Sequence, residues 1–199
     1  MLSQKELELK IDPAVPTLKQ YWELVLKWQN SVNLISNNTI KEGWNRHILD
    51  SAQLYFLIPE NKESLLDVGS GGGFPGIVIA ILNHVLQGNL KHITLVESDL
   101  KKSLFLEEVI RVLNLQVTVL NERIENIKIQ PDVITARAFA PLDRMLKLLQ
   151  KNVSRETILI LPKGKNVDDE LKNVSLNQKI EKITNCINPE GCILKIGEK

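Results

Sequence analysis

The sequence predicts an α/β fold in which helices cover both faces of a mostly parallel, seven-stranded sheet. Short apolar runs alternate with helical stretches from about residue 63 onward, and this alternation is typical of βαβ units. A glycine-rich segment follows the first apolar run. A helical region that holds all three Trp and both Tyr residues precedes it, before residue 60. Together these observations predict a nucleotide-type α/β domain with an N-terminal helical extension.

Length and composition suit one globular unit, because the chain has 199 residues, of which 43% are hydrophobic and 25% are charged. The formal net charge of +1 argues at first sight against a nucleic-acid partner. The charge is unevenly distributed, however. Residues 137–165 carry seven basic and two acidic side chains, whereas residues 1–62 carry seven of each sign. The sequence therefore still allows a local basic surface that contacts phosphate, despite the small net charge.

Several other classes of protein are excluded. Cys186 and Cys192 are too few for a disulfide framework, and the three histidines lack the spacing of metal ligands. The longest apolar run, at 74–82, is shorter than the ~20 residues of a membrane span. We therefore expect a cytoplasmic protein without metal or membrane contact. We also expect a monomer, since no apolar surface helix remains for a subunit interface once the two N-terminal helices cover the sheet.

Two helices are predicted at residues 17–35 and 39–57, and residues 1–62 are expected to form a helical cap on a domain of residues 63–199. The Trp residues of this cap allow two interpretations. They form either a base-stacking platform or a helix face that packs on the core. Core packing is favoured, because large aromatic side chains mostly contribute buried area.

The remaining elements follow in alternating order. Strands are predicted at 64–68, 92–97, 116–120, 132–137 and 157–162. Helices are predicted at 75–87, 100–114, 142–152 and 166–175. A β-hairpin around the NPEG turn closes the chain between residues 179 and 196 and adds antiparallel pairing.

The segment DVGSGGGFPG, residues 67–76, is the most informative. Ligands of open parallel sheets bind beyond the carboxyl ends of the strands, and glycines let the backbone approach them closely. Counted from Gly71, the segment satisfies G-x-G-x-x-G, and Glu97 is in the place of the acid that binds ribose. This first pattern indicates a site for a dinucleotide cofactor. Counted from Asp67, the pattern is D-x-G-x-G-x-G with an acid at the end of the next strand. This second pattern resembles the class I S-adenosylmethionine (SAM)-dependent methyltransferases.

Further motifs narrow the resemblance. They are NLIS (33–36), RHILDS (46–51), DVGSGGGFPGIVIAI (67–81), TLVESDLKKSLFLEEV (94–109), VITARAFAPL (133–142) and LPKGK (161–165). In this order the chain resembles the RsmG (GidB) family, whose members methylate N7 of one guanine in small-subunit ribosomal RNA. The resemblance implies a Rossmann-like class I methyltransferase fold, SAM as cofactor, and the small ribosomal subunit or its rRNA as partner.

The resemblance also implies the site residues. Cofactor-binding positions are Asp67, Gly69, Gly71, Phe74, Glu97, Ile124, Glu125 and Arg137, with Ile124 and Glu125 at the adenine. Candidates for RNA contact are Arg46, His47, Arg144, Lys163 and Lys165. Each position has a structural alternative. Ile124 could be a core residue, Glu125 a solvated one, and Arg137 the partner of a carboxylate such as Asp67.

The expected chemistry needs no catalytic acid, base or nucleophile. Guanine N7 carries a lone pair and no proton at neutral pH, so positioning alone can supply much of the rate. RAFAPL stands where adenine-N6 methyltransferases have an Asn/Asp-Pro-Pro-aromatic motif. Two other functions stay open at this point: a methyltransferase with a small-molecule or protein acceptor, and an NAD-dependent oxidoreductase.

Overall fold

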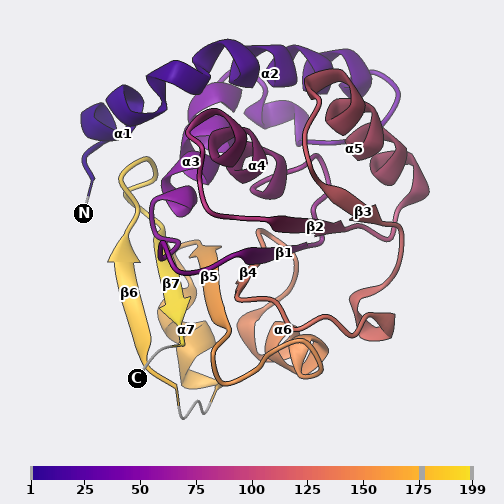
Figure 1. The fold of residues 1–199 in the computed structure, drawn as a ribbon. Coiled ribbons are helices and arrows are strands. Elements are labelled where there is room, and N and C mark those ends of the chain that lie inside the picture. Colours follow the sequence, from indigo (N-terminus) through magenta and orange to yellow (C-terminus); the bar gives the residue numbers. More distant parts are fainter. Residues whose placement is uncertain (1, 175–177, 198–199) are drawn as a thin grey trace.

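The computed structural model describes residues 2–174 and 178–197. Seven strands form one sheet in the order β3-β2-β1-β4-β5-β7-β6 (Figure 1). The strands are β1 (Ser64–Val68), β2 (His92–Val96), β3 (Thr118–Leu120), β4 (Val133–Thr135), β5 (Ile158–Lys163), β6 (Ile180–Thr184) and β7 (Cys192–Ile196). The first five pair in parallel, and β7 runs antiparallel to both β5 and β6. The predicted mostly parallel, seven-stranded sheet with a terminal hairpin is confirmed.

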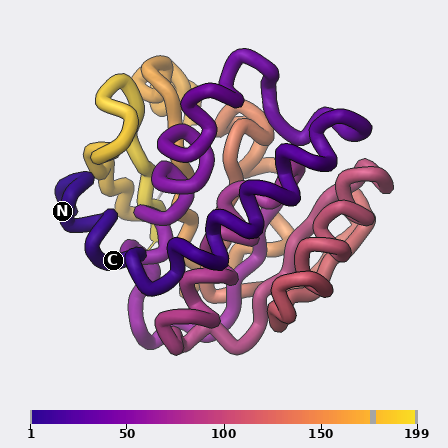
Figure 2. The backbone as a smooth tube through the Cα atoms, turned by 90° about the horizontal axis from the view of Figure 1, so that it is seen from above, coloured from indigo at the N-terminus to yellow at the C-terminus, as the bar shows by residue number. Residues whose placement is uncertain are grey.

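Helices cover both faces of this sheet, as predicted. They are α1 (Gln4–Ile11), α2 (Val15–Gln29), α3 (Asp50–Tyr55), α4 (Gly76–Val85), α5 (Leu100–Leu113), α6 (Leu142–Leu149) and α7 (Val167–Lys172). In Figure 1, α1 to α5 lie on one side of the sheet and α6 and α7 on the other. Seen from above in Figure 2, α2 crosses the molecule next to α5. Among the described residues, no helix is both long and apolar enough to cross a membrane.

The two faces have separate cores, which the alternation along the strands produces. On β1, Leu65 joins the core beneath α1 to α5, whereas Leu66 joins the core against α6 and α7. On β5, Ile160 belongs to the first core and Leu161 to the second. Successive side chains of a strand point to opposite faces, so a sheet covered on both sides needs strands that are apolar throughout.

The aromatic residues of the N-terminal region serve packing. Trp22, Trp28 and Trp44 all lie against the core of the α1–α5 face. The ring of Trp28 meets that of Phe105 on α5, with the ring centroids 5.6 Å apart. The core-packing interpretation of these tryptophans is therefore confirmed, although each side chain remains partly exposed.

Helix α1 was not predicted, although the sequence holds a signal for it. Ser3 and Glu6 form a capping box, in which the Ser3 hydroxyl accepts from the Glu6 amide and the Glu6 carboxylate accepts from the Ser3 amide. A Ser followed three residues later by Glu is a recognisable helix start. The helix is short but buries Leu7 and Ile11.

The helix predicted at 17–35 is present but ends at Gln29. The Gln29 side chain explains this early end. Its amide oxygen accepts from the backbone N–H groups of Leu34 and Ile35, and its amide nitrogen donates to the Ile35 carbonyl. The turn after α2 thus has its backbone polar groups satisfied by a side chain, and continuing the helix would lose these bonds.

The helix predicted at 39–57 is shorter and partly of another kind. A π-helical turn spans Trp44–Leu49 and continues directly into α3. Gly43, just before it, lies against the Trp22 ring with no room for a side chain. π-Helical turns are rare and frequently occur at functional sites. This one carries His47 and ends beside Asp50, and both residues face the end of β4.

Candidate active site

The glycine loop joins β1 to α4 at the carboxyl edge of the sheet. Gly69 and Gly71 have φ values of +67° and +55°, a left-handed conformation that favours glycine. The amides of Gly69 and Ser70 donate to the Val96 carbonyl at the end of β2, over 2.9 and 3.1 Å. The loop is therefore anchored beside the residue that follows β2, which is Glu97.

The carboxylate of Glu97 contacts the backbone of the glycine loop directly. Its Oε2 accepts from the Gly71 amide at 2.7 Å, and its Oε1 accepts from the Asp99 amide at 2.8 Å. A carboxylate has about four lone-pair sites, so each oxygen retains capacity for another hydrogen bond. The glycine loop and Glu97 thus fit the ribose hydroxyls of an adenosyl cofactor.

Asp67 lies completely buried beneath the same loop. It pairs in register with Thr135 of β4, whose hydroxyl donates to its Oδ1 at 2.8 Å. Its Oδ2 accepts from the amide of Gly76, the first residue of α4, at 3.2 Å. Burial raises the pKa of Asp67 to about 6. This side chain therefore shapes the loop from below.

A cavity opens beyond the ends of β1, β2 and β3. It is lined by Gly69, Ile124 and Glu125 of the predicted cofactor set and by Arg144 of the predicted RNA contacts. Phe139 lines it too, and its ring lies so close to Gly69 that a Cβ there would come within 2.5 Å of it. The sequence assigned no role to Phe139, although its place two residues after Arg137 in RAFA could have indicated one.

Phe74 and Arg137 lie on the other side of the loop, against the N-terminal helices. The Phe74 ring packs on His47 and Tyr21, with centroid distances of 5.0 and 5.4 Å. The Arg137 guanidinium lies 5.2 Å from the centroid of the Phe74 ring. The Tyr21 hydroxyl donates to the Gly72 carbonyl at 2.5 Å, so α2 holds the glycine loop directly.

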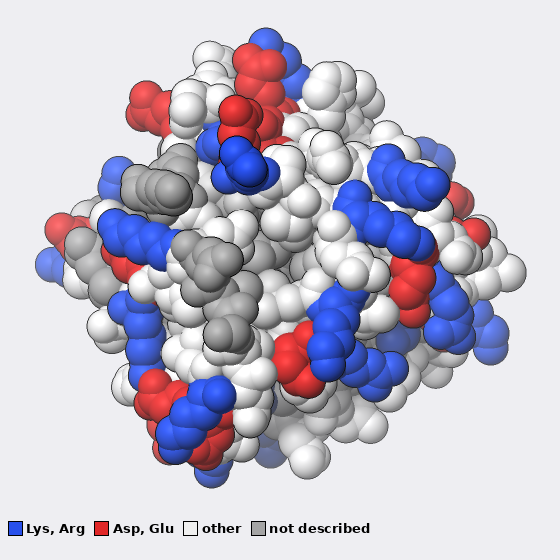
Figure 3. All heavy atoms as spheres, turned by 90° about the horizontal axis from the view of Figure 1, so that it is seen from below, with Lys and Arg blue, Asp and Glu red and all other residues white. Residues whose placement is uncertain are grey.

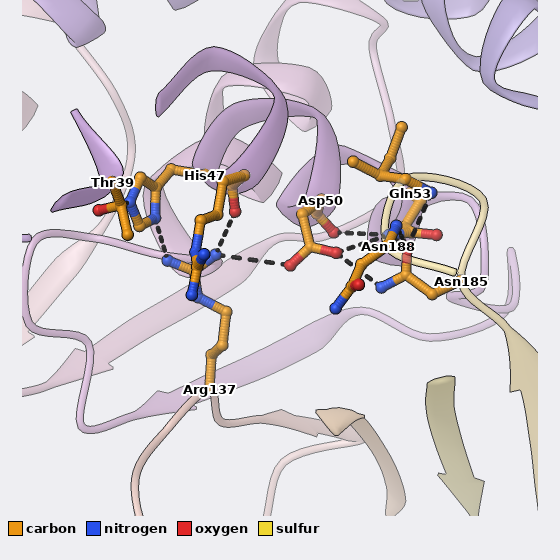
Figure 4. A network of polar contacts seen from close by, with 9 residues as sticks. Thr39, His47, Asp50, Gln53, Arg137, Asn185 and Asn188 are labelled. Carbon is orange, nitrogen blue, oxygen red and sulfur yellow. Dashed lines mark hydrogen bonds and ion pairs between the residues drawn. The ribbon is translucent and has the colours of Figure 1, made fainter. Parts of the chain in front are cut away.

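Arg137 is held by the segment RHILDS (Figure 4). Its guanidinium donates to the Arg46 carbonyl at 3.0 Å and to Nδ1 of His47 at 2.6 Å. It also forms an ion pair with Asp50 at 3.5 Å. The expectation that Arg137 pairs with a carboxylate is therefore confirmed, but the partner is Asp50 and not Asp67, whose oxygens accept from Thr135 and Gly76.

The five predicted RNA contacts differ in exposure. Arg46, Arg144 and Lys165 are exposed. His47 is buried against Arg137, and the Lys163 ammonium pairs with Glu170 at 2.7 Å. Figure 3 shows the face that carries α6 and α7, where Lys and Arg surround a hollowed middle and Asp and Glu lie among them. The structure thus leaves three of the five side chains accessible to a large partner.

No group of three or more His, Cys, Asp or Glu side chains within residues 2–174 and 178–197 is arranged to hold a metal ion. What the site does offer is a backbone cradle, a carboxylate that can accept further hydrogen bonds, and a cavity wall of mixed polar and apolar side chains. This arrangement can bind and orient an adenosyl compound at the carboxyl edge of the sheet.

Solved structures share this architecture. The S-adenosylhomocysteine (SAH)-bound methyltransferase PaMTH1 of Podospora anserina superposes with a TM-score of 0.64 at 12% identity, covering 92% of this chain and 88% of that one. A ribosomal protein L11 methylase from Lactobacillus delbrueckii subsp. bulgaricus superposes with a TM-score of 0.59 at 15% identity, covering 77% and 79%. The strand order, the glycine loop and Glu97 define a class I SAM-dependent methyltransferase.

Comparison of the sequence identifies the family. The GidB model, described as rRNA small subunit methyltransferase G, matches residues 14–190. Proteins named ribosomal RNA small subunit methyltransferase G from Rhodospirillum rubrum and Bartonella tribocorum are 40% and 45% identical, over 92% and 90% of this chain and 90% and 85% of their own lengths. The chain belongs to the GidB family, and the NAD-dependent oxidoreductase interpretation is wrong.

Proposed function

We propose that the protein transfers a methyl group from SAM to N7 of a guanine in small-subunit ribosomal RNA. The observation that carries this proposal is the match to relatives named for small-subunit rRNA methylation over nine tenths of the chain. The cavity beside the glycine loop supports it, since Arg144, an exposed cation, forms part of its wall.

Each element of the site has a part in holding the cofactor. Glu97 accepts from the ribose, the backbone at Gly69 and Gly71 forms the cradle, and Ile124 with Glu125 bounds the adenine. Asp67 shapes the loop, while Phe74 and Arg137 serve the methionine end. The carboxylate of SAM is its one anionic group, and a guanidinium pairs best with such a carboxylate. When bound, SAM supplies a methyl group on a sulfonium that is ready for in-line displacement.

The protein's own residues contribute orientation and exclusion of water. Guanine N7 attacks through a lone pair, so no proton has to be removed. Histidine is the most common general base, but both ring nitrogens of His47 already form hydrogen bonds, one with Arg137 and one with Thr39. This agrees with a reaction driven by positioning, which can supply up to about 7–11 kcal/mol.

The acceptor RNA is proposed to lie over the cavity mouth. Arg144 and Arg123 line the cavity, and Arg46 and Lys165 are exposed elsewhere. Cations of this kind contact phosphate and set the position of the RNA, while the pocket selects the base. We also propose that the protein acts in the cytoplasm as a monomer, because exposed large apolar side chains are few among the described residues and only Leu100 and Leu104 share an element.

Methyl transfer tests the proposal directly. The protein is incubated with SAM labelled in the methyl group and with small ribosomal subunits, naked rRNA or a panel of small molecules. We expect label in small-subunit RNA, at a position that chain cleavage specific for 7-methylguanine reveals. Label in a small molecule and none in RNA would support the alternative acceptor. Label in RNA that resists this cleavage would refute the N7 assignment.

A further inference from the structure

We propose that Asp50 is a positioning residue, which fixes the Arg137 guanidinium toward the carboxylate of the cofactor, and that Asn185 of the terminal hairpin holds Asp50 in place. The inference deepens the proposed function and rests on it for the role of Arg137. Its evidence is a polar network that joins three segments far apart in the sequence (Figure 4).

The guanidinium of Arg137 is oriented from one side. The Arg46 carbonyl, Nδ1 of His47 and the carboxylate of Asp50 engage its two terminal nitrogens. A guanidinium has five N–H donors. Among the described residues, the Nε hydrogen of Arg137 has no hydrogen-bond partner. This donor is thus available to a ligand.

Asp50 is the acid that balances this charge. It forms the one ion pair of Arg137 within residues 2–174 and 178–197, and the two side chains are 14% and 18% exposed. Their separation of 3.5 Å makes the contact mainly electrostatic. Because both side chains are shielded from water, their attraction is stronger than that of an ion pair at the surface. Removing either partner leaves the charge of the other uncompensated.

Asp50 is itself held from the opposite side. Its Oδ1 accepts from Asn185 Nδ2 at 2.7 Å and from Gln53 Nε2 at 3.0 Å. Gln53 also donates to Asn185 Oδ1 at 2.9 Å, which closes a triangle of side chains. Asn185 and Gln53 are both buried. The Asp50 carboxylate therefore has one oxygen for the hairpin and one for Arg137.

Asn185 in turn is fixed by its own loop. Its Oδ1 accepts from the backbone amides of Ile187 at 2.9 Å and Asn188 at 2.8 Å, at the turn between β6 and β7. The side-chain oxygen Oε1 of Gln53 accepts from the Cys186 backbone amide at 3.2 Å. The turn of the terminal hairpin thus hydrogen-bonds to Asp50 and Gln53 of α3. Through Asp50 it also fixes Arg137, which follows β4.

A double-mutant cycle separates positioning from mere stabilisation. SAH affinity is measured by calorimetry for Asp50→Asn, Arg137→Gln and the double variant. Each single variant is expected to weaken binding about tenfold. The double variant is expected to bind no more weakly than Arg137→Gln, because Asp50 acts through Arg137. Asp50→Glu, which keeps the charge, is expected to recover most of the affinity.

The control is Glu63→Gln, which removes an acid from an exposed pair with Lys91. We expect unchanged SAH affinity for this variant.

Where Asp50→Asn does not fold, Asn185→Ser replaces it in the same cycle. We expect a smaller loss of SAH affinity, which again disappears when Arg137→Gln is also present. Additive losses would overturn the inference, as would a lowered melting temperature with unchanged SAH affinity. A wild-type protein that binds SAH but labels no RNA would refute the proposed function instead.

Discussion

The guanidinium of Arg137 donates a hydrogen bond to Nδ1 of His47 over 2.6 Å. A guanidinium carries donors only, so Nδ1 accepts and the ring hydrogen of His47 resides on Nε2. From there it donates to the Thr39 hydroxyl at 2.9 Å, which donates to the Ser36 carbonyl at 2.6 Å. Burial, followed by the charge of Arg137, lowers the pKa of His47 to about 3. The ring is thus a neutral spacer between Arg137 and the N-terminal region.

The first prediction concerns the pH dependence of stability. Between pH 6.5 and 3 the unfolded chain binds a proton at His47 that the folded chain does not, so the free energy of unfolding falls as the pH falls through this window. We expect His47→Gln to lose less stability than the wild type between pH 7 and pH 5 in urea titrations. Asp67 changes the pH dependence of stability in the opposite direction, because its pKa is raised. Both proteins contain Asp67, so its contribution cancels in the comparison.

Nitrogen NMR of the His47 ring checks the same prediction without a variant. The ring is expected to remain the neutral tautomer with hydrogen on Nε2 at pH 5. Protonation of this ring between pH 7 and pH 5 would contradict both the tautomer and the hydrogen-bond chain.

A second prediction concerns the tie between α2 and the glycine loop. Tyr21 is fully buried, and Tyr21→Phe leaves the Gly72 carbonyl without its partner. We expect a loss of about 1–3 kcal/mol in the free energy of unfolding, because a buried unsatisfied carbonyl costs that much. Chemical denaturation measures it.

Tyr55→Phe is the matched control for Tyr21→Phe. The Tyr55 hydroxyl has no hydrogen-bond partner among the residues that the structure describes, so its removal is expected to change stability little. Equal losses in the two variants would show that the bond to Gly72 contributes nothing specific.

The sequence predicts those features that depend on local pattern. Alternating apolar runs predict strands that bury both faces, as Leu65 and Leu66 do, and spacing alone places Glu97 beside the glycine loop. The Asp50–Asn185 bond was not predicted. It joins residues 135 positions apart, and no periodicity encodes such a meeting. The partner of Lys163 was missed for a different reason: Glu170 is only seven positions away, but the two meet because the chain turns between β5 and α7.

A third prediction concerns space at the start of α4. A Cβ on Gly76 would collide with Leu95 on β2 and lie 2.7 Å from Oδ2 of Asp67. We expect Gly76→Ala to lower the free energy of unfolding by about 1–3 kcal/mol, as overpacking does. SAH affinity is expected to fall with it, because the loop above Asp67 has to shift.

Gly164→Ala provides the comparison, since nothing lies within 4 Å of a Cβ built there. Its stability and SAH affinity are expected to match those of the wild type, by thermal melting and calorimetry. A Gly76→Ala protein as stable as Gly164→Ala would mean that β2 and α4 separate easily.

The last prediction contrasts two neighbouring lysines. The Lys163 ammonium pairs with Glu170, whose Oε2 also accepts from the Leu142 amide at the start of α6 at 2.8 Å. Lys163→Met is therefore expected to lower the free energy of unfolding by at least about 1 kcal/mol, because it leaves this shielded carboxylate without its cation. Lys165 is exposed, so Lys165→Met is expected to change stability by less than about 0.5 kcal/mol.

RNA binding is expected to reverse that order. A lysine that contacts phosphate contributes about one unit to the slope of log affinity against log salt concentration. We expect Lys165→Met to reduce this slope by about one and Lys163→Met to leave it unchanged, in titrations of small-subunit rRNA at several salt concentrations. If Lys163→Met reduced the slope while its stability stayed intact, Lys163 would contact RNA and its pairing with Glu170 would break when RNA binds.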